Sequence, residues 1–112
     1  MSNSYVLQYS PAARDDLRKI YMYIAFDLMA SENAEGQVKR IRNEIRSLNF
    51  MPSRYEIVDW EPWKSMRMRK VPVDNFVIYY TVNDDTRTVT IIRIFYGGRN
   101  IKDIINTEFG TF

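Results

Sequence analysis

The sequence contains no cysteine and no histidine. Without cysteine, the chain can form neither a disulfide nor a thiolate metal site. Without histidine, it lacks the commonest general base and the commonest metal ligand of proteins. We therefore expect no metal site and no cofactor, and any catalysis must use other side chains.

Long apolar runs are also missing. No stretch approaches the roughly 20 apolar residues that span a bilayer, and the N-terminal MSNSYVLQYSP lacks the basic region and apolar stretch of a signal peptide. These absences predict a cytoplasmic protein with no membrane partner. Glycine and proline number four each and 46% of the residues are hydrophobic, which is typical of a globular chain. We predict a single domain over residues 1–112.

The net charge is only +2, which by itself does not indicate a nucleic-acid partner. The positive charge is nevertheless concentrated in the middle of the chain, where residues 37–70 contain nine basic and four acidic residues. The basic ones are Lys39, Arg40, Arg42, Arg46, Arg54, Lys64, Arg67, Arg69 and Lys70. Such a region attracts an acidic partner.

Two amphipathic helices are predicted in the first half of the chain. Ser10 is a candidate cap and Pro11 suits the first position of a helix over roughly 11–29. Ser31 is the candidate cap of a second helix, which Pro52 closes. Each helix has an apolar stripe at helical spacing: Leu17, Ile20, Tyr21, Ile24 and Leu28 on the first, and Ala34, Val38, Ile41, Ile45 and Leu48 on the second. The short link between them predicts an antiparallel hairpin packed on a sheet.

The sheet is predicted from clusters of aromatic and branched residues. The expected strands are Tyr5–Tyr9, Met66–Arg69, Phe76–Val82 and Val89–Tyr96, with turn residues at Asn83–Thr86, an irregular connection over 51–64 and a short helix over 99–105. Because the helices precede most of the strands, we predict the α+β class: an N-terminal strand, a helical hairpin on a twisted antiparallel sheet, and a short C-terminal helix.

Several side chains in these elements carry predictions of their own. The alternation MRMR places Met66 and Met68 on one face of a strand, with Arg67 and Arg69 on the other. Arg93 lies in an apolar strand, where burial requires a carboxylate partner. We expect Trp60 and Trp63 to cover the edge of a core. Tyr79 and Tyr80 are adjacent in a strand and therefore point to opposite faces. An exposed apolar patch is expected at Tyr23, Phe26 and Met29.

Four segments together resemble the RelE/ParE superfamily of toxins, which are often described as plasmid-stabilisation proteins. They are YSPAARDDLRKIYMYI, the helix end RSLNFMP, the block MRMRKVPVDNFVIYYTV and the final TVTIIRIFYGGR. The resemblance covers nearly the whole chain, and it rests on the order and spacing of the segments. It implies a helical hairpin on a twisted antiparallel sheet, and a toxin held inactive by a small antitoxin protein in a hetero-oligomer.

The resemblance leaves two mechanisms open. RelE-like members cut messenger RNA on the ribosome with basic residues of the middle strands and an arginine after the last strand, which Arg67, Arg69 and Arg99 match. ParE-like members inhibit DNA gyrase and lack this set. Two departures favour the second mechanism: Phe76 stands where RNase members commonly carry an arginine, and Ile105 where they often carry a tyrosine.

For an endoribonuclease, the three arginines are the cations that stabilise the phosphate in the transition state. Arginine is a poor base, so the proton acceptor is a carboxylate, a perturbed Tyr96 or Lys64. Lys64 and Lys70 are the candidate nucleic-acid-binding residues. A structural reading of Arg67 and Arg69 is also open, in which they solvate the outer face of a half-buried strand.

The sequence therefore predicts a growth-arresting toxin that acts as a ribosome-dependent endoribonuclease. Two alternatives stay open: a gyrase inhibitor without catalytic activity, and a degenerate member that only binds its antitoxin. In each case we expect the antitoxin to lay a short amphipathic segment on apolar surface. Its carboxylates are predicted to approach Arg67, Arg69 and Arg99.

Overall fold

Four strands and two long helices make up the chain over residues 4–98, the part that the computed structural model describes. The elements in order are β1 (Val6–Tyr9), α1 (Pro11–Met22), the π-helical turn η1 (Tyr23–Asp27), α2 (Ser31–Ser47), the 3-10 turn η2 (Pro52–Arg54), β2 (Arg69–Val73), β3 (Phe76–Asn83) and β4 (Thr88–Tyr96). The predicted helix over 99–105 lies outside the described residues. Within them, no helix combines the length and apolar character needed to cross a membrane.

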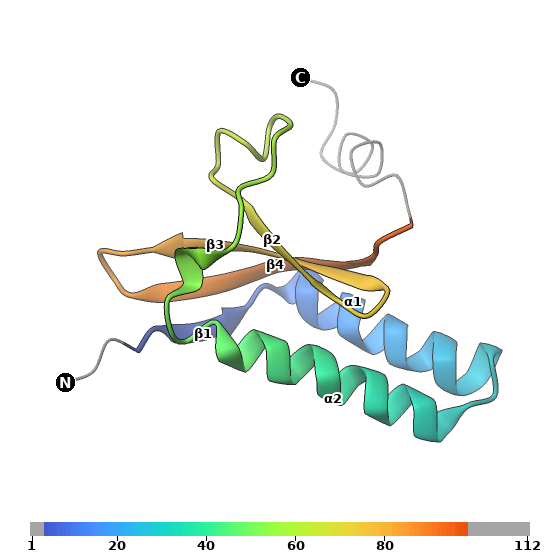
Figure 1. Cartoon of the computed structure of the whole chain (residues 1–112). Coiled ribbons are helices and arrows are strands. Elements are labelled where there is room, and N and C mark those ends of the chain that lie inside the picture. Colours follow the sequence, from blue (N-terminus) through green and yellow to red (C-terminus); the bar gives the residue numbers. More distant parts are fainter. Residues whose placement is uncertain (1–3, 99–112) are drawn as a thin grey trace.

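The sheet has the order β1-β4-β3-β2, and the helical hairpin of α1 and α2 covers one of its faces (Figure 1). β2 and β4 pair antiparallel with β3, whereas β1 pairs parallel with β4. The α+β class, the N-terminal strand and the helical hairpin on an antiparallel sheet are therefore confirmed, and the structure adds that β1 joins this sheet in parallel. A parallel pair requires a long crossover, which the helices and the other two strands provide here.

The helix boundaries follow from local backbone chemistry. Ser10 caps α1, because its hydroxyl accepts a hydrogen bond from the Ala13 N–H at 3.0 Å. The predicted helix over 11–29 is α1 continued by η1, in which the Leu28 N–H donates to the Tyr23 carbonyl. The predicted Ser31 cap is wrong: Met29 has a φ of 52°, Ala30 takes the cap position without a side-chain bond, and Ser31 is already helical.

The main core lies between the helices and the sheet. Its buried members are Ala13, Leu17, Ile41, Ile45, Leu48, Val71, Val73, Ile78, Tyr80, Val89, Ile91 and Ile94. Both predicted apolar stripes contribute to it. The buried hydroxyl of Tyr80 donates a hydrogen bond to the Pro52 carbonyl at 2.6 Å, which satisfies this polar group inside the core. Burial raises the pKa of the Tyr80 hydroxyl to about 12.

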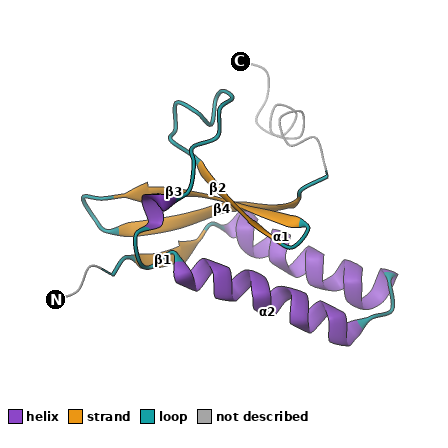
Figure 2. Ribbon diagram, in the orientation of Figure 1, coloured by secondary structure: helices purple, strands orange, loops and turns teal. Residues whose placement is uncertain are grey.

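A second core of buried side chains lies on the opposite face of the sheet. Figure 2 shows the backbone of the segment of 55–68, which contributes to it, as a loop on the side of the sheet away from the helices. Trp63 is 2% exposed, stacks on Trp60 at a centroid distance of 5.1 Å and contacts Tyr79 at 4.8 Å. Tyr79 belongs to this core and Tyr80 to the other, so their predicted opposite orientation is confirmed. The prediction that the tryptophans cover a core is confirmed as well, since Trp60 packs against the same cluster.

α1 closes the edge of β4 beyond the end of β1. The Ser10 hydroxyl donates to the Ile92 carbonyl, and Asp16 accepts the Ile94 N–H at 2.9 Å. The same carboxylate accepts two bonds from Arg93, from Nε at 2.7 Å and from Nη2 at 3.0 Å. The pairing of β3 with β4 has a bulge next to Arg93, between the pairs Tyr79–Arg93 and Tyr80–Ile91. The predicted carboxylate partner of Arg93 is thus confirmed as Asp16.

A surface cluster ties the β2–β3 turn to α2. Asp74, at a φ of 55° in this turn, accepts hydrogen bonds from Arg40 Nε at 2.7 Å and Gln37 Nε2 at 3.0 Å. The bonds from Arg40 and then Gln37 lower the pKa of the Asp74 carboxyl below its ordinary value of 3.8. The ionised carboxylate therefore stabilises the fold.

We expect the stability contributed by Asp74 to depend on pH. A carboxyl with a lowered pKa in the folded state contributes fully above its ordinary pKa of 3.8, and the contribution disappears as the pH falls through the lowered value. Urea unfolding of the wild type and Asp74→Asn between pH 2 and pH 7 measures this. The difference between the two should be largest at neutral pH and shrink below about pH 4. A difference that stays constant over this range would contradict the assignment.

Candidate partner-binding site

The segment predicted to carry the RNase residues does not form a strand throughout. β2 begins only at Arg69, and Arg67 has a φ of 58°, which a strand does not allow. The Met68 N–H donates to the Trp63 carbonyl and the Arg67 N–H to the Lys64 carbonyl, so the chain turns around the buried Trp63. The predicted alternation is therefore wrong: Met68 is buried while Met66 is 54% exposed.

The basic side chains of this segment lie apart. Arg69 points to the helical face of the sheet, because Val71 and Val73 of the same strand belong to the core under the helices. Its Nη1 donates to the Tyr55 carbonyl at 2.5 Å. Lys70 points to the other face, with Nζ 3.7 Å from Glu56 Oε2, and Lys64 and Arg67 are exposed in the preceding turn.

Tyr96 lies at the other end of the sheet. It pairs with Phe76, and the two rings meet edge to face at a centroid distance of 5.9 Å. Arg69 pairs with Tyr80, four residues further along β3. At about 3.3 Å per residue and 4.8 Å per strand, the Cα atoms of Arg69 and Tyr96 are about 16 Å apart. The fold does not bring these two candidate catalytic residues together, and Arg99 lies outside the described residues.

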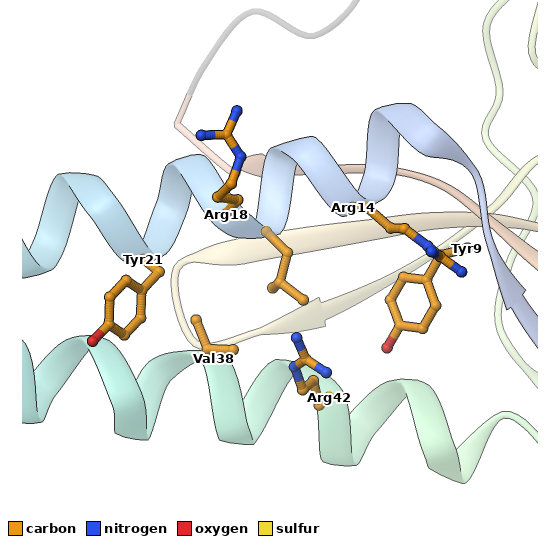
Figure 3. A pocket seen from close by; sticks show the side chains of 7 residues that line it. Tyr9, Arg14, Arg18, Tyr21, Val38 and Arg42 are labelled. Atoms are coloured by element: carbon orange, nitrogen blue, oxygen red, sulfur yellow. The ribbon is translucent and has the colours of Figure 1, made fainter.

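A cleft that the sequence analysis did not predict opens between α1 and α2. Its volume is about 540 Å³, and its lining consists of Tyr9, Arg14, Leu17, Arg18, Tyr21, Val38 and Arg42. Leu17 and Val38 provide apolar surface between the two helices. Figure 3 shows Arg14 beside the Tyr9 ring at one end of the cleft, with Arg42 reaching toward them from α2. We refer to this cavity as the arginine cleft.

The arginine cleft is positively charged. No acidic residue lines it. Arg18 is neutralised by Asp15 of the same helix at 2.6 Å, whereas Arg14 and Arg42 have no ion-pair partner among residues 4–98. Burial raises the pKa of the Tyr9 hydroxyl, and the charges of Arg42, Arg46 and Arg14 oppose this rise. Two of these arginines, Arg14 and Arg42, line the cleft together with Tyr9, and this arrangement suits an anionic group.

The sequence carries a signal for this cleft, although a weak one. Arg14, Arg18 and Tyr21 follow one another at helical spacing beside the apolar stripe of α1, and Val38 and Arg42 do so on α2. Arg42 belongs to the basic region of residues 37–70, whereas Arg14 lies in the N-terminal part of the chain, which is acidic overall. Only the packing of the hairpin brings these two arginines to the same cleft.

The tip of the hairpin exposes the predicted apolar patch. Tyr23, Phe26 and Met29 are 55%, 67% and 88% exposed, which confirms the predicted exposure; a binding role for them stays a prediction. This tip adjoins a cavity of about 760 Å³ that Tyr23 lines together with Phe76 and Tyr96. The patch is far from Arg69, because Tyr55, which accepts the bond from Arg69, donates its hydroxyl to Glu44 near the other end of α2. The 17 residues of α2 span about 25 Å.

One premise of the predicted antitoxin interface is wrong, because Arg67 and Arg69 do not project together from one strand. A short segment lying on the patch of Tyr23, Phe26 and Met29 does not reach Arg69. The approach of antitoxin carboxylates to Arg67, Arg69 and Arg99 stays a prediction. Among residues 4–98, no group of three or more acidic side chains is arranged to hold a metal ion.

A comparison with protein families gives one match over most of the chain. The family described as the ParE toxin of the type II toxin-antitoxin system, parDE, matches residues 7–101. Among curated proteins, no sequence matches the chain.

The fold is similar to that of several solved structures. The chromosomal ParDE toxin–antitoxin system from P. aeruginosa superposes with a TM-score of 0.68 at 21% identity, over 85% of this chain and 98% of that one. The RelBE2 toxin–antitoxin complex from Mycobacterium tuberculosis gives 0.62 at 18% identity, over 83% and 91%. The archaeal RelE–RelB complex from Pyrococcus horikoshii gives 0.60 at 12% identity, over 86% and 98%. At these identities the similarity shows a shared fold.

Proposed function

This chain belongs to the ParE family of toxins of type II toxin–antitoxin systems, and from that premise we propose that it arrests growth by binding a protein target and does not cut RNA. The target we propose is DNA gyrase, which the resemblance to ParE implies. The premise agrees with the predicted membership of the RelE/ParE superfamily, whose fold the solved relatives share.

The separation of two candidate catalytic residues, Arg69 and Tyr96, carries the proposal. Cleavage of RNA through the 2′-hydroxyl requires a base, an acid and cations around a single phosphate, each within hydrogen-bond reach. Arg69 already donates a hydrogen bond to the Tyr55 carbonyl. The Cα atoms of Arg69 and Tyr96 are about 16 Å apart in the sheet. Binding to a protein target has no such requirement, because it depends on a complementary surface and not on catalytic groups held around one atom.

Phe76 supports the same proposal. RNase members of the superfamily commonly carry an arginine at this position, whereas here Phe76 packs edge to face against Tyr96. Both rings line the cavity of about 760 Å³ beside the tip of the hairpin. Large exposed apolar side chains around this cavity are typical of a surface that binds another protein.

A supercoiling assay with purified gyrase tests the proposal. We expect the toxin to inhibit supercoiling, and Arg67→Ala/Arg69→Ala to inhibit at the same concentration within about twofold, because the loss of two charges and of one hydrogen bond costs only about 1 kcal/mol of stability. Circular dichroism melting of the double variant verifies that it is folded. Supercoiling that is unaffected by a large excess of the wild type would rule out gyrase as the target.

Primer extension on messages from induced cells tests the alternative mechanism. Discrete cuts at translated codons that disappear in Arg67→Ala/Arg69→Ala would establish the endoribonuclease and overturn our proposal. Growth that continues after induction would instead identify a degenerate member that retains only antitoxin binding.

The partner of the toxin is an antitoxin. The relatives with this fold include the ParDE and RelBE2 toxin–antitoxin systems, and we propose that this toxin likewise forms a hetero-oligomer with a small antitoxin. Covering an apolar surface of the toxin with the antitoxin is sufficient to block a toxin that acts by binding.

A further inference from the structure

We infer that the arginine cleft between α1 and α2 is the docking site for an acidic amphipathic segment of the antitoxin. The segment places an apolar side chain on Leu17 and Val38 and a carboxylate between Arg14 and Arg42. This inference rests on the proposed function for the existence of the antitoxin. It moves the charged part of the interface from Arg67 and Arg69, where the sequence predicted it, to the outside of the helical hairpin.

The charges of the cleft identify the chemistry of the occupant. Arg14 and Arg42 come from different helices and converge on the Tyr9 ring (Figure 3). Like charges brought together are unfavourable, and none of the lining residues supplies a carboxylate to offset this. A carboxylate from a partner would relieve the repulsion and accept hydrogen bonds from both guanidinium groups.

The apolar part of the lining favours a peptide over a nucleic acid. Leu17 follows Arg14 by three residues on α1, and Val38 precedes Arg42 by four on α2, so apolar surface adjoins the two arginines in the cleft; the rings of Tyr9 and Tyr21 complete the lining. A phosphate backbone presents no apolar group to such a surface, whereas an amphipathic peptide presents apolar and acidic side chains at adjacent positions. The cavity of about 540 Å³ has room for one or two large side chains.

Titration of the isotope-labelled full-length toxin with designed probes tests the inference, with the side-chain N–H signals of Arg14 and Arg42 as the readout. The main probe is an amphipathic helical peptide of about 14 residues with leucine on one side and glutamate beside it. A second peptide has the same composition in a shuffled order that is not amphipathic. Inorganic phosphate and a short DNA duplex are the remaining probes.

We expect the acidic amphipathic peptide to shift both arginine signals and to bind at least about tenfold more weakly to Arg14→Ala/Arg42→Ala. The matched control is Lys19→Ala/Lys39→Ala, which removes the same charge from the same two helices outside the cleft. The control should change the affinity by less than about twofold at physiological salt, because exposed charges are screened. The shuffled peptide should bind more weakly than the amphipathic one.

Three results would overturn the inference. Equal weakening in both double variants would show that only the net charge matters. Binding of the amphipathic peptide without a shift of Arg14 and Arg42 would place the site elsewhere. Stronger occupation of the cleft by the DNA duplex would make it a nucleic-acid site. The gyrase assay is independent of these titrations, so a failure of the proposed target and a failure of the docking site are distinguished.

Discussion

Replacing Asp16 with alanine is expected to lower the free energy of unfolding by about 3–5 kcal/mol, because it leaves the guanidinium group of Arg93 buried and without its carboxylate. Arg93 and Asp16 are 9% and 8% exposed and are joined by two hydrogen bonds. The same carboxylate also accepts the Ile94 N–H at the edge of β4. Urea unfolding followed by circular dichroism measures the loss.

Asp15→Ala is the matched control for this prediction. Asp15 is the neighbouring residue on α1 and pairs with Arg18 and Lys19 at the surface, where the carboxylate is 40% exposed. Its removal should lower the stability much less than Asp16→Ala does, because exposed ion pairs are screened by solvent and contribute little. A similar loss for both variants would contradict the role assigned to the buried pair.

Replacing both residues of the buried ion pair with leucine distinguishes the effect of an unpaired charge on stability from the effect of lost packing. In Asp16→Leu/Arg93→Leu neither buried charge remains, so we expect this variant to be more stable than Asp16→Ala. The recovery should be incomplete, because the Ile94 N–H loses its acceptor and Arg93 no longer covers the Phe95 ring, which it contacts at 4.4 Å. A double variant as unstable as Asp16→Ala would show that the shape of the pair matters more than its charge.

Trp63→Ala is expected to lower the free energy of unfolding by about 3–5 kcal/mol, since it opens a cavity in the second core. Trp63 contacts Trp60 and Tyr79 and is almost fully buried. The segment of 55–68 is held on the sheet mainly through this core. Urea unfolding gives the loss.

Trp60→Ala is the control for Trp63, because Trp60 is only partly buried and packs against the outside of the same core. We expect a smaller loss, about 1–2 kcal/mol. Equal losses for the two variants, or a loss for Trp63→Ala below about 1 kcal/mol, would show that the second core does not hold the loop.

The local parts of the fold could be predicted from the sequence because their causes lie within a few residues. The apolar stripes of α1 and α2 repeat at helical spacing, Ser10 caps within its own turn, and the runs of β3 and β4 flank a short polar turn. The absence of cysteine and histidine limits the chemistry in the same direct way. These features need no knowledge of the rest of the molecule.

Failures occurred where a tertiary contact overrode the local pattern. Met66 to Arg69 alternates like a strand, but burial of Trp63 forces a turn, and Arg67 takes a left-handed conformation. β1 has the composition of any edge strand, and only the crossover of the chain makes its pairing parallel. Two residues that the sequence analysis grouped as candidate catalytic residues, Arg69 and Tyr96, consequently lie at different ends of the sheet.

The sequence by itself determined the class of the fold, its helical hairpin, the order of its strands along the chain and the superfamily that it resembles. The tertiary structure alone decided that Asp16 meets Arg93, 77 residues away in the chain, and that Arg14 and Arg42 face the same cleft. The physical reason is that periodicity and capping act between near neighbours in sequence, whereas the convergence of charges depends on how whole elements pack.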